Sequence, residues 1–230
     1  MTKDIPFYST NEDPGVLRIF LIRHGQTAEN SQKILQGHLD TDLNEIGIEQ
    51  AQKLGQYLKQ NRKIKFDQVF SSDLKRCQQT TKEFLGEYPE TERPEVQLQY
   101  GLRERSMGEI QGMFLSDAEQ YAEKRGKASF RDFGETPDEF QHRLTQTVSE
   151  IVQGSQDSQN IAIVSHGGSI RQLLKWFNYT EHDMHRIIVF NTSCTIIDYH
   201  KQSHKFGVKR VGNTQHLGGG EFIVSDLRLR

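Results

Sequence analysis

The chain alternates short apolar runs with longer stretches whose apolar residues recur at helical spacing. Residues 17–22 ("LRIFLI"), 66–72 ("FDQVFSS") and 160–165 ("NIAIVS") have the pattern of strands buried in a parallel sheet. Segments 41–60 and 74–88, which follow the first two runs, have the spacing of amphipathic helices. This succession of strand and helix predicts an α/β fold.

Local signals predict the remaining elements. Thr136 is a candidate N-cap, Pro137 suits the first helical position, and Glu139 lies three residues after the cap. These residues predict a helix that runs to about Val152. Further predicted elements are a strand at 95–100, a helix after Gly168, and two short strands or one bent strand at 186–200. We find no internal repeat or linker, so the 230 residues are expected to form a single domain, 1–230.

The overall charge and the cysteine content exclude some classes of function. Lys and Arg total 29 against 31 acidic residues, which argues against a nucleic-acid-binding protein that relies on a global positive field. Cys77 and Cys194 lie far apart, which fits a reducing compartment and offers no zinc framework. The N-terminus lacks the features of a leader, and no stretch approaches the roughly 18 apolar residues of a membrane span. We expect a cytoplasmic protein with access to the nucleus and no membrane partner.

Two histidines stand at the ends of predicted strands, and each is followed by glycine. His24 follows the first strand and His166 the last of the three apolar runs. Ligands of parallel α/β sheets bind beyond these carboxyl ends. Glycine lets the backbone approach a ligand closely, and the helix after Gly168 would direct amide groups at an anion. The guanidinium of Arg23 adds a fork suited to phosphate.

Two other interpretations of these histidines are weaker. A single His-Gly pair occurs by chance in many loops, but two at strand ends, one preceded by Arg23, make chance a poor explanation. A metal site would call for a third imidazole or a carboxylate, and an arginine is a poor neighbour for a divalent cation. The pattern therefore favours an anion site, with no metal.

Five motifs, in this order along the chain, resemble those of the histidine phosphatase superfamily, which includes cofactor-dependent phosphoglycerate mutases. They are "LIRHGQTAEN" (21–30), "LNEIGIEQA" (43–51), "SSDLKRCQQT" (71–80), "GLRERSMG" (101–108) and "VSHGGSIR" (164–171). The ending "VGNTQHLGGGEFIVSDLRLR" is similar to that of small fungal phosphoglycerate-mutase-like phosphatases. The resemblance implies a three-layer α/β/α sandwich with a mostly parallel central sheet. It also implies a short helical insertion, roughly 105–145, that forms a cap.

The resemblance also implies a role for each matched residue. His24 matches the nucleophile that becomes a phosphohistidine, and Glu104 matches the proton donor. Arg23 and Arg76 match the arginines that bind the phosphoryl oxygens, and His166 matches the second histidine of the pocket. Such enzymes use no metal or cofactor. Further phosphate-binding candidates are Asn30, Thr27 and Gly167, and the candidates for substrate specificity are Arg105 and Met107.

Elementary electrostatics supports these roles. A phosphomonoester dianion needs positive charge around its oxygens while the P–O bond breaks. Arg23, Arg76 and a protonated His166 would supply that charge. Because Glu104 must carry a proton to assist the leaving group, we expect activity to fall in alkali. A surface ion pair of Glu104 with a neighbouring arginine is the plainer alternative.

Three functions compete for such a pocket. The first is a phosphatase for small phosphomonoesters, such as phosphorylated sugars or related metabolites; the second is a phosphoglycerate mutase; the third is a non-catalytic phosphate-binding module. The segment from Glu104 to His166 has only about 60 residues, shorter than in the mutases, and an open pocket admits water. We therefore predict the phosphatase. Homo-oligomerisation is left open, as is whether the tail 201–230 covers a sheet edge or mediates self-association.

Overall fold

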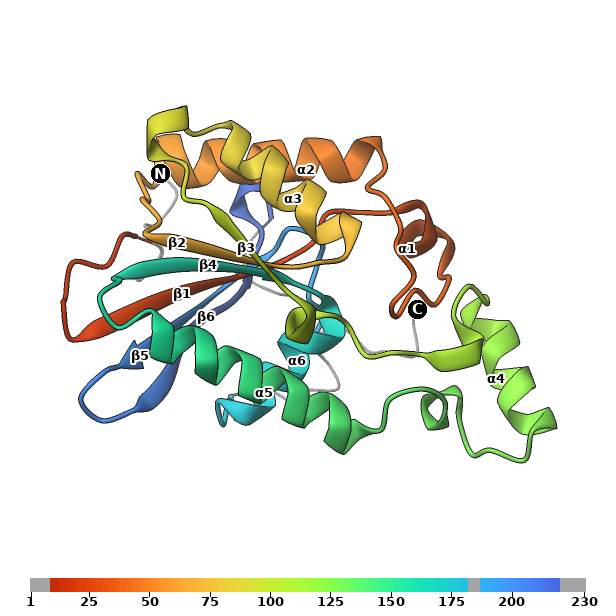
Figure 1. Ribbon diagram of the computed structural model, residues 1–230. Coiled ribbons are helices and arrows are strands. Elements are labelled where there is room, and N and C mark those ends of the chain that lie inside the picture. Colours follow the sequence, from red (N-terminus) through yellow and green to blue (C-terminus); the bar gives the residue numbers. More distant parts are fainter. Residues whose placement is uncertain (1–8, 182–186, 220–230) are drawn as a thin grey trace.

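The molecule is built on one six-stranded sheet, seen edge-on in the ribbon view (Figure 1). The structure is a computed structural model that describes residues 9–181 and 187–219. Its strand order is β3-β2-β4-β1-β5-β6. The strands are β1 (Val16–Arg23), β2 (Gln68–Ser72), β3 (Val96–Gln99), β4 (Asn160–Ser165), β5 (Cys194–His200) and β6 (Lys205–Asn213).

The register of the central strands brings the two histidines together. Strands β1 to β4 are mutually parallel where they pair, whereas β5 and β6 run antiparallel. In the β1–β4 pair Arg23 lies opposite Ser165, so both strands end at the same level. The amide of His24 continues this pairing and donates to the carbonyl of Ser165 at 3.0 Å. His24 and His166 therefore leave adjacent strands side by side.

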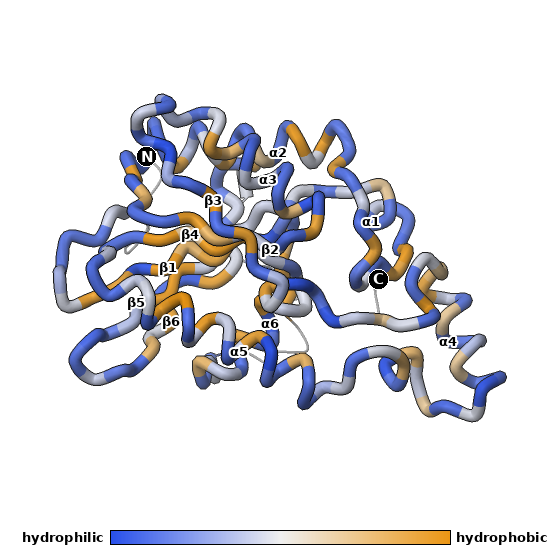
Figure 2. The backbone as a smooth tube through the Cα atoms, in the orientation of Figure 1, coloured by the Kyte–Doolittle hydropathy of each residue, from blue (hydrophilic) through white to orange (hydrophobic). Residues whose placement is uncertain are grey.

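Helices cover both faces of the sheet and make three layers (Figure 1). One face packs on α2 (Glu45–Gln56) and α3 (Lys75–Gly86), and the other on α5 (Pro137–Gly154) and α6 (Gly167–Trp176). Along β1 the odd residues 17, 19 and 21 face α5 and α6, while 20 and 22 face α2 and α3. The apolar colouring accordingly concentrates on the central strands (Figure 2). β1 is buried on both faces, as its uninterrupted apolar run predicts.

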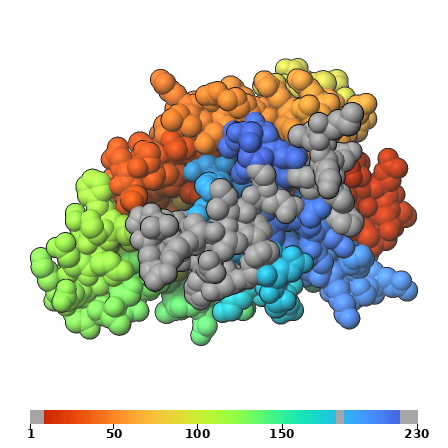
Figure 3. Space-filling model, turned by 180° about the vertical axis from the view of Figure 1, so that it is seen from behind, coloured from red at the N-terminus to blue at the C-terminus, as the bar shows by residue number. Residues whose placement is uncertain are grey.

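A smaller apolar cluster forms the cap beyond the carboxyl ends of the strands. Its helix is α4 (Leu115–Lys124), whose Ala118 and Ala122 pack on Phe130 and Phe133. The cap is joined to the loop after α1 (Ala28–Gln32) by a β-bridge between Ile34 and Phe114. Viewed from behind, the two segments lie side by side at the surface (Figure 3). The short helical turns are η1 (Tyr57–Asn61), η2 (Glu90–Glu92), η3 (Tyr100–Leu102), η4 (Gly108–Ile110), η5 (Phe130–Asp132) and η7 (Gln215–Leu217).

The α/β class, the three layers and the mostly parallel sheet agree with the sequence prediction, and the helix at Pro137 has the predicted capping box on Thr136. One prediction of strand content differs, and the tail adds a strand that the sequence did not predict. Of the segment 186–200, the described residues 187–200 contribute only β5 as a regular strand, because residues 189–192 instead form a turn that supports the end of β1. Residues 205–213 in the tail form β6, at the edge of the sheet. In the described parts of the chain no helix is long and apolar enough to cross a membrane.

Candidate active site

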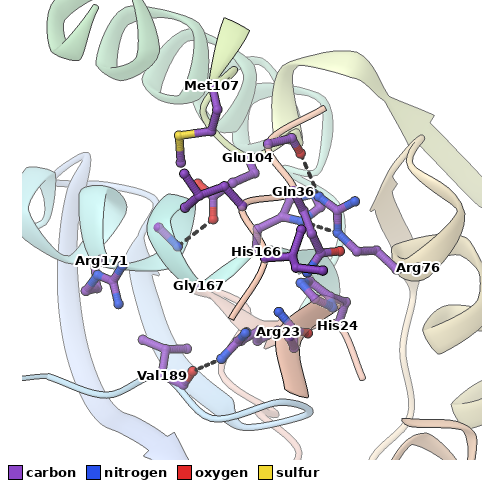
Figure 4. Close-up of a pocket in the computed structure, with 15 residues that line it drawn as sticks. Arg23, His24, Gln36, Arg76, Glu104, Met107, His166, Gly167, Arg171 and Val189 are labelled. Atoms are coloured by element: carbon purple, nitrogen blue, oxygen red, sulfur yellow. Dashed lines mark hydrogen bonds between the residues drawn. The ribbon is translucent and has the colours of Figure 1, made fainter. Parts of the chain in front are cut away.

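The carboxyl ends of β1 and β4 open onto a cavity of about 220 Å³ that lies under the cap (Figure 4). Eight of the ten site residues predicted from the sequence line it: Arg23, His24, Asn30, Arg76, Glu104, Met107, His166 and Gly167. The two others, Thr27 and Arg105, are not among its lining residues. The cavity opens to solvent, and it is small enough that a ligand inside it must be a metabolite or one end of a larger molecule.

His24 forms the floor of the cavity, with its imidazole buried and oriented by its own backbone. Nδ1 lies 2.7 Å from the carbonyl oxygen of Gly25, and because a carbonyl can only accept, Nδ1 carries the proton. Nε2 is then left with its lone pair. Burial, and after it the charges of Arg76 and Arg23, hold the pKa of His24 well below its ordinary value. The ring is therefore neutral at physiological pH, as a nitrogen nucleophile must be.

Close backbone packing fixes the loop that carries His24. The amide of Gly25 donates to the hydroxyl of Thr80 on α3 at 2.9 Å. A Cβ on Gly25 would lie 2.6 Å from the carbonyl oxygen of Gly47, and a Cβ on Gly47 would lie 2.1 Å from that of Gln26. Only glycine permits such an approach. The first turn of α2 therefore presses directly on the loop.

Arg76 comes from the first turn of α3 and is almost fully buried. It donates to the carbonyl oxygens of Gly37 at 2.8 Å and Leu39 at 2.7 Å, and its Nε donates to Nδ1 of His166 at 3.2 Å. These contacts tie the loop after α1 to the end of β4. The guanidinium of Arg76 is therefore held in a fixed position beside the cavity.

His166 is neutral in this pocket, whereas the role expected from the sequence needs a protonated ring when phosphate is bound. Nδ1 accepts from Arg76, so the ring proton lies on Nε2, which donates to the hydroxyl of Ser72 at 3.0 Å. Burial lowers the pKa of His166 well below its usual value, and the charge of Arg76 and the neighbouring His24 act in the same direction. An imidazole packed among cations does not take up another charge until an anion enters.

Arg23 is the last residue of β1, and its side chain reaches the start of α6. Its guanidinium donates to the carbonyl oxygen of Val189 at 2.5 Å. A Cβ on Gly167 would lie 3.3 Å from Nε of Arg23, so the glycine leaves room for the side chain. The turn at residues 189–192 thus holds Arg23 in place from outside the sheet.

Glu104 reaches the cavity from the opposite wall. One carboxyl oxygen accepts from the amide of Gly168 at 2.7 Å and the other from the amide of Arg105 at 2.9 Å. A Cβ on Gly168 would lie 2.4 Å from the carboxyl, so the second glycine of "HGG" makes room for the acid. The sequence alternative, an ion pair with a neighbouring arginine, is not formed. The guanidinium of Arg103 instead makes a bidentate pair with Asp73 at 2.7 Å.

The backbone beneath Glu104 is held by a second arginine. Arg143 on α5 donates to the carbonyl oxygens of Gly101, Arg103 and Glu104 at 2.9 to 3.1 Å. Glu135 completes this contact through an ion pair with Arg143 at 2.7 Å. The acid therefore sits on a segment braced by α5.

The remaining predicted residues divide between the cavity and its supports. Asn30 lines the cavity, and Thr27 is the N-cap of α1 and accepts from the amide of Asn30 at 3.1 Å. The guanidinium of Arg105 donates to three cap carbonyls, those of residues 131, 133 and 135. Met107 lines the cavity beside Glu104 (Figure 4).

Sequence reasoning did not select several residues that line the cavity, among them Gln36, Val189 and Arg171. Arg171 had a usable signal, because it closes the motif "VSHGGSIR" one helical turn after Gly167. Gln36 and Val189 lie in loops whose path no local pattern predicts. In residues 9–181 and 187–219 no group of three or more His, Cys, Asp or Glu side chains is placed to hold a metal ion.

Comparison with known proteins agrees with this geometry. Residues 19–214 match the family described as the histidine phosphatase superfamily (branch 1). A broad-specificity phosphatase of Saccharomyces cerevisiae is 56% identical over the full length of both chains. A probable phosphatase of Schizosaccharomyces pombe is 35% identical over 89% of this chain and 97% of its own.

The fold has close counterparts among solved structures. The phosphoglycerate mutase of Bacillus anthracis superposes with a TM-score of 0.77 at 24% identity and covers 92% of this chain and 97% of its own. At that identity the match concerns the fold alone. The family match spans most of the chain and includes every residue that lines the cavity. The chain therefore belongs to branch 1 of the histidine phosphatase superfamily and is a phosphatase of that family.

Proposed function

We propose that the protein is a metal-independent phosphatase that hydrolyses small phosphomonoesters, such as phosphorylated sugars or related metabolites, through a phosphohistidine at His24. One observation carries the proposal. A buried, neutral His24, with its proton fixed on Nδ1, lies in the same small cavity as two arginines and the carboxyl of Glu104. The similarity to a broad-specificity phosphatase over the whole chain supports it.

The reaction has two steps. Arg23 and Arg76 bind the phosphoryl oxygens, each worth ~10²–10³ in rate if preorganised. Nε2 of His24 attacks phosphorus, the bond to the ester oxygen breaks, and that oxygen takes the proton of Glu104. The Glu104 carboxylate then takes a proton from water, which attacks the phosphohistidine, releases inorganic phosphate and restores His24.

Two further groups stabilise charge during the attack of His24: the backbone carbonyl of Gly25 and the imidazole of His166. The Nδ1 proton of His24 donates to the Gly25 carbonyl, which stabilises the positive charge that the ring gains on attack. A bound dianion opposes the field of Arg23 and Arg76, so it favours proton uptake by His166. In its protonated form the ring would add positive charge beside the phosphoryl group.

Hydrolysis is favoured over return of the phosphoryl group to a reoriented substrate. About 60 residues separate Glu104 from His166. The cap, roughly 105–145, is fully described and contains two α-helical parts, α4 and the start of α5. The cavity opens to solvent, so water can reach a phosphohistidine. A purely phosphate-binding module is disfavoured because nucleophile, acid and both arginines are present. We also propose that the cap is part of a single domain, 1–230.

The test is phosphate release by purified protein in EDTA from a panel of phosphorylated sugars, glycerates, nucleotides and phosphopeptides. Phosphoenzyme is trapped in alkali, where a phosphohistidine is stable. His24→Ala should abolish turnover and trapping. His142→Ala, which removes an exposed histidine from α5, is the matched control and should retain both.

Each contrary result has a definite meaning. Turnover by His24→Ala at the wild-type rate would exclude the phosphohistidine. Absence of turnover by the wild type on every substrate would favour the binding module. Interconversion of phosphoglycerates faster than their hydrolysis would favour the mutase.

A further inference from the structure

A third arginine lines the cavity, and the reaction above does not use it. Arg171 lies on α6 one helical turn after Gly167, so both residues face the cavity. In the close-up, Arg76 and Arg171 lie on opposite sides of the pocket (Figure 4). The two catalytic arginines are close to the histidines, whereas Arg171 stands apart from them.

The guanidinium of Arg171 has donors available for a ligand. It is half-buried, and among the described residues no hydrogen bond, ion pair or ring contact is formed by its guanidinium. Arg76, by contrast, donates to two carbonyls and to His166. A guanidinium has five N–H donors in a planar fork that matches a carboxylate or a phosphate. Arg171 thus offers its donors to a ligand.

The charges around the cavity also leave Arg171 without a counterion. The ionisable lining groups besides the two histidines are Arg23, Arg76, Arg171 and Glu104. When Glu104 carries the proton that it donates, the phosphoryl dianion balances two of the three guanidinium groups. The third retains its charge in a partly desolvated position, where an anion is favoured.

No other candidate on the walls provides this charge. The cap contributes Met107 to the lining, and the loop after α1 contributes residues 34–37; none of these side chains carries a charge. Arg105, the specificity candidate from the sequence, directs its guanidinium at cap carbonyls. Arg171 is left as the group that can recognise a second charged part of the substrate.

We propose that Arg171 binds a second anionic group of the substrate, so that the enzyme prefers phosphomonoesters carrying a carboxylate or a second phosphate a few bonds from the phosphoryl group. The inference rests on the proposed function, because it assumes that the phosphoryl group occupies the site at His24. A cavity of about 220 Å³ keeps the two anionic groups close together, on one small molecule or on one end of a larger one.

The experiment compares substrates that differ only in the second group. 3-Phosphoglycerate and glycerol 3-phosphate differ by a carboxylate in place of CH₂OH, and fructose 1,6-bisphosphate and fructose 6-phosphate differ by a second phosphate. The quantity measured is the ratio of kcat/KM within each pair. In the wild type we expect the anionic member of at least one pair to be preferred. Arg171→Gln should reduce that ratio ~10–100-fold, mainly through KM, because it removes a charged hydrogen bond.

Two variants make the result specific. Arg171→Lys, which keeps the charge but not the fork, should retain part of the ratio. Lys175→Gln removes an exposed charge one turn further along α6, outside the cavity lining, and should leave the ratio unchanged. The pair that responds tells carboxylate from phosphate recognition.

The inference is overturned if the wild type shows no preference in either pair, or if Arg171→Gln lowers kcat/KM equally for both members of a pair. These outcomes differ from failure of the proposed function. That failure would appear as absence of hydrolysis of all four substrates by the wild type, before any variant is compared.

Discussion

At the scale of single residues, the position of the Glu104 carboxyl depends on residue 168 being a glycine. Gly168 lies in the first turn of α6, where alanine would ordinarily stabilise the helix by ~1 kcal/mol. The Glu104 carboxyl occupies the space of that absent Cβ and accepts the amide of Gly168 at 2.7 Å. Helix stability and acid placement therefore favour different residues at this position.

Gly168→Ala should separate these two effects. We expect the melting temperature to stay the same or rise, because a carboxyl at the end of a flexible side chain can move away cheaply. We expect kcat for alkyl phosphates to fall by ~10²-fold or more, because the displaced acid no longer protonates the leaving alkoxide. The checks are thermal unfolding and steady-state kinetics on glycerol 3-phosphate.

A second substrate tells loss of the acid from general damage to the site. p-Nitrophenyl phosphate releases a phenolate that needs no proton, so Gly168→Ala should slow its first step, measured as the burst of p-nitrophenol, much less. Glu104→Gln should show the same dependence on the leaving group. Equal losses in the first step on both substrates, measured in a single turnover, would mean that the variant disturbs phosphate binding instead.

Reasoning from the sequence identified the ionisable residues of the site. It did not predict their protonation or their hydrogen bonds, which depend on residues distant in the sequence. Arg23, His24, Arg76, Glu104 and His166 were found because each lies in a motif, and the structure brings them into one cavity. The protonation of His166 was not predictable, because it depends on burial beside Arg76, which lies about 90 residues away in the sequence. The sequence singled out Arg105 for specificity and did not select Arg171, because spacing alone does not show which guanidinium is bound by carbonyls.

At the scale of elements, the backbone of α2 packs directly on the backbone of the loop that carries His24, at Gly25 and Gln26. Gly47 on α2 has no room for a Cβ, because the backbone of Gln26 would lie 2.1 Å away. Gly86, in the last turn of α3, has no atom within 4 Å of the same hypothetical Cβ. The two glycines offer a matched pair with opposite expectations.

Gly47→Ala should destabilise the protein by ~1–3 kcal/mol and lower kcat ~10–100-fold, because α2 or the loop must move and carry His24 with it. Gly86→Ala should be neutral or stabilise by ~0.4–1 kcal/mol with unchanged kcat. Chemical denaturation and phosphate release measure both quantities. If Gly47→Ala behaved like Gly86→Ala, the α2–loop contact would not position the nucleophile.

The elements that the sequence pattern did not reveal share a weak apolar signal. α4 buries only Ala118 and Ala122, which are too small to stand out as a hydrophobic stripe. β6 contains two lysines, an arginine and two glycines, and it is only partly buried at the edge of the sheet. The central strands and α5 have strong periodicity and a capping box, and their existence was predicted correctly.

At the scale of the whole molecule, a half-buried histidine near the C-terminal end of the described chain, His216, connects acid stability to the active site. Nε2 of His216 lies 2.9 Å from the hydroxyl of Thr192, which donates its own hydrogen to the carbonyl of Asn191. Nε2 must therefore carry the proton, and the buried Nδ1 has no hydrogen-bond partner in the described structure. The amide of Thr192 in turn donates to the carbonyl of Arg23 at 3.0 Å.

Protonation of His216 would place a hydrogen on a buried atom that faces no acceptor. Burial, and after it the charge of Lys53, lowers the pKa of His216 to about 4, against about 6.5 in the unfolded chain. Between these values the unfolded chain binds more protons than the folded one, so the free energy of unfolding increases with pH. The contribution of His216 is thus fully present above pH ~6.5 and is lost as the pH falls toward 4. His24 and His166, whose pKa values are also lowered, act in the same direction.

We therefore expect the protein to become less stable as the pH falls from 7 to 4.5, and His216→Gln to reduce this dependence. Glutamine keeps an N–H donor for Thr192 and does not titrate, so it removes the contribution of one histidine, at most ~1.4 kcal/mol per pH unit. Urea unfolding across this pH range, in buffers without phosphate, measures the slope. His142→Gln, at an exposed position on α5, is the control and should leave the slope unchanged. A slope that is identical in His216→Gln and the wild type would show that His216 takes up its proton as readily in the folded state as in the unfolded one.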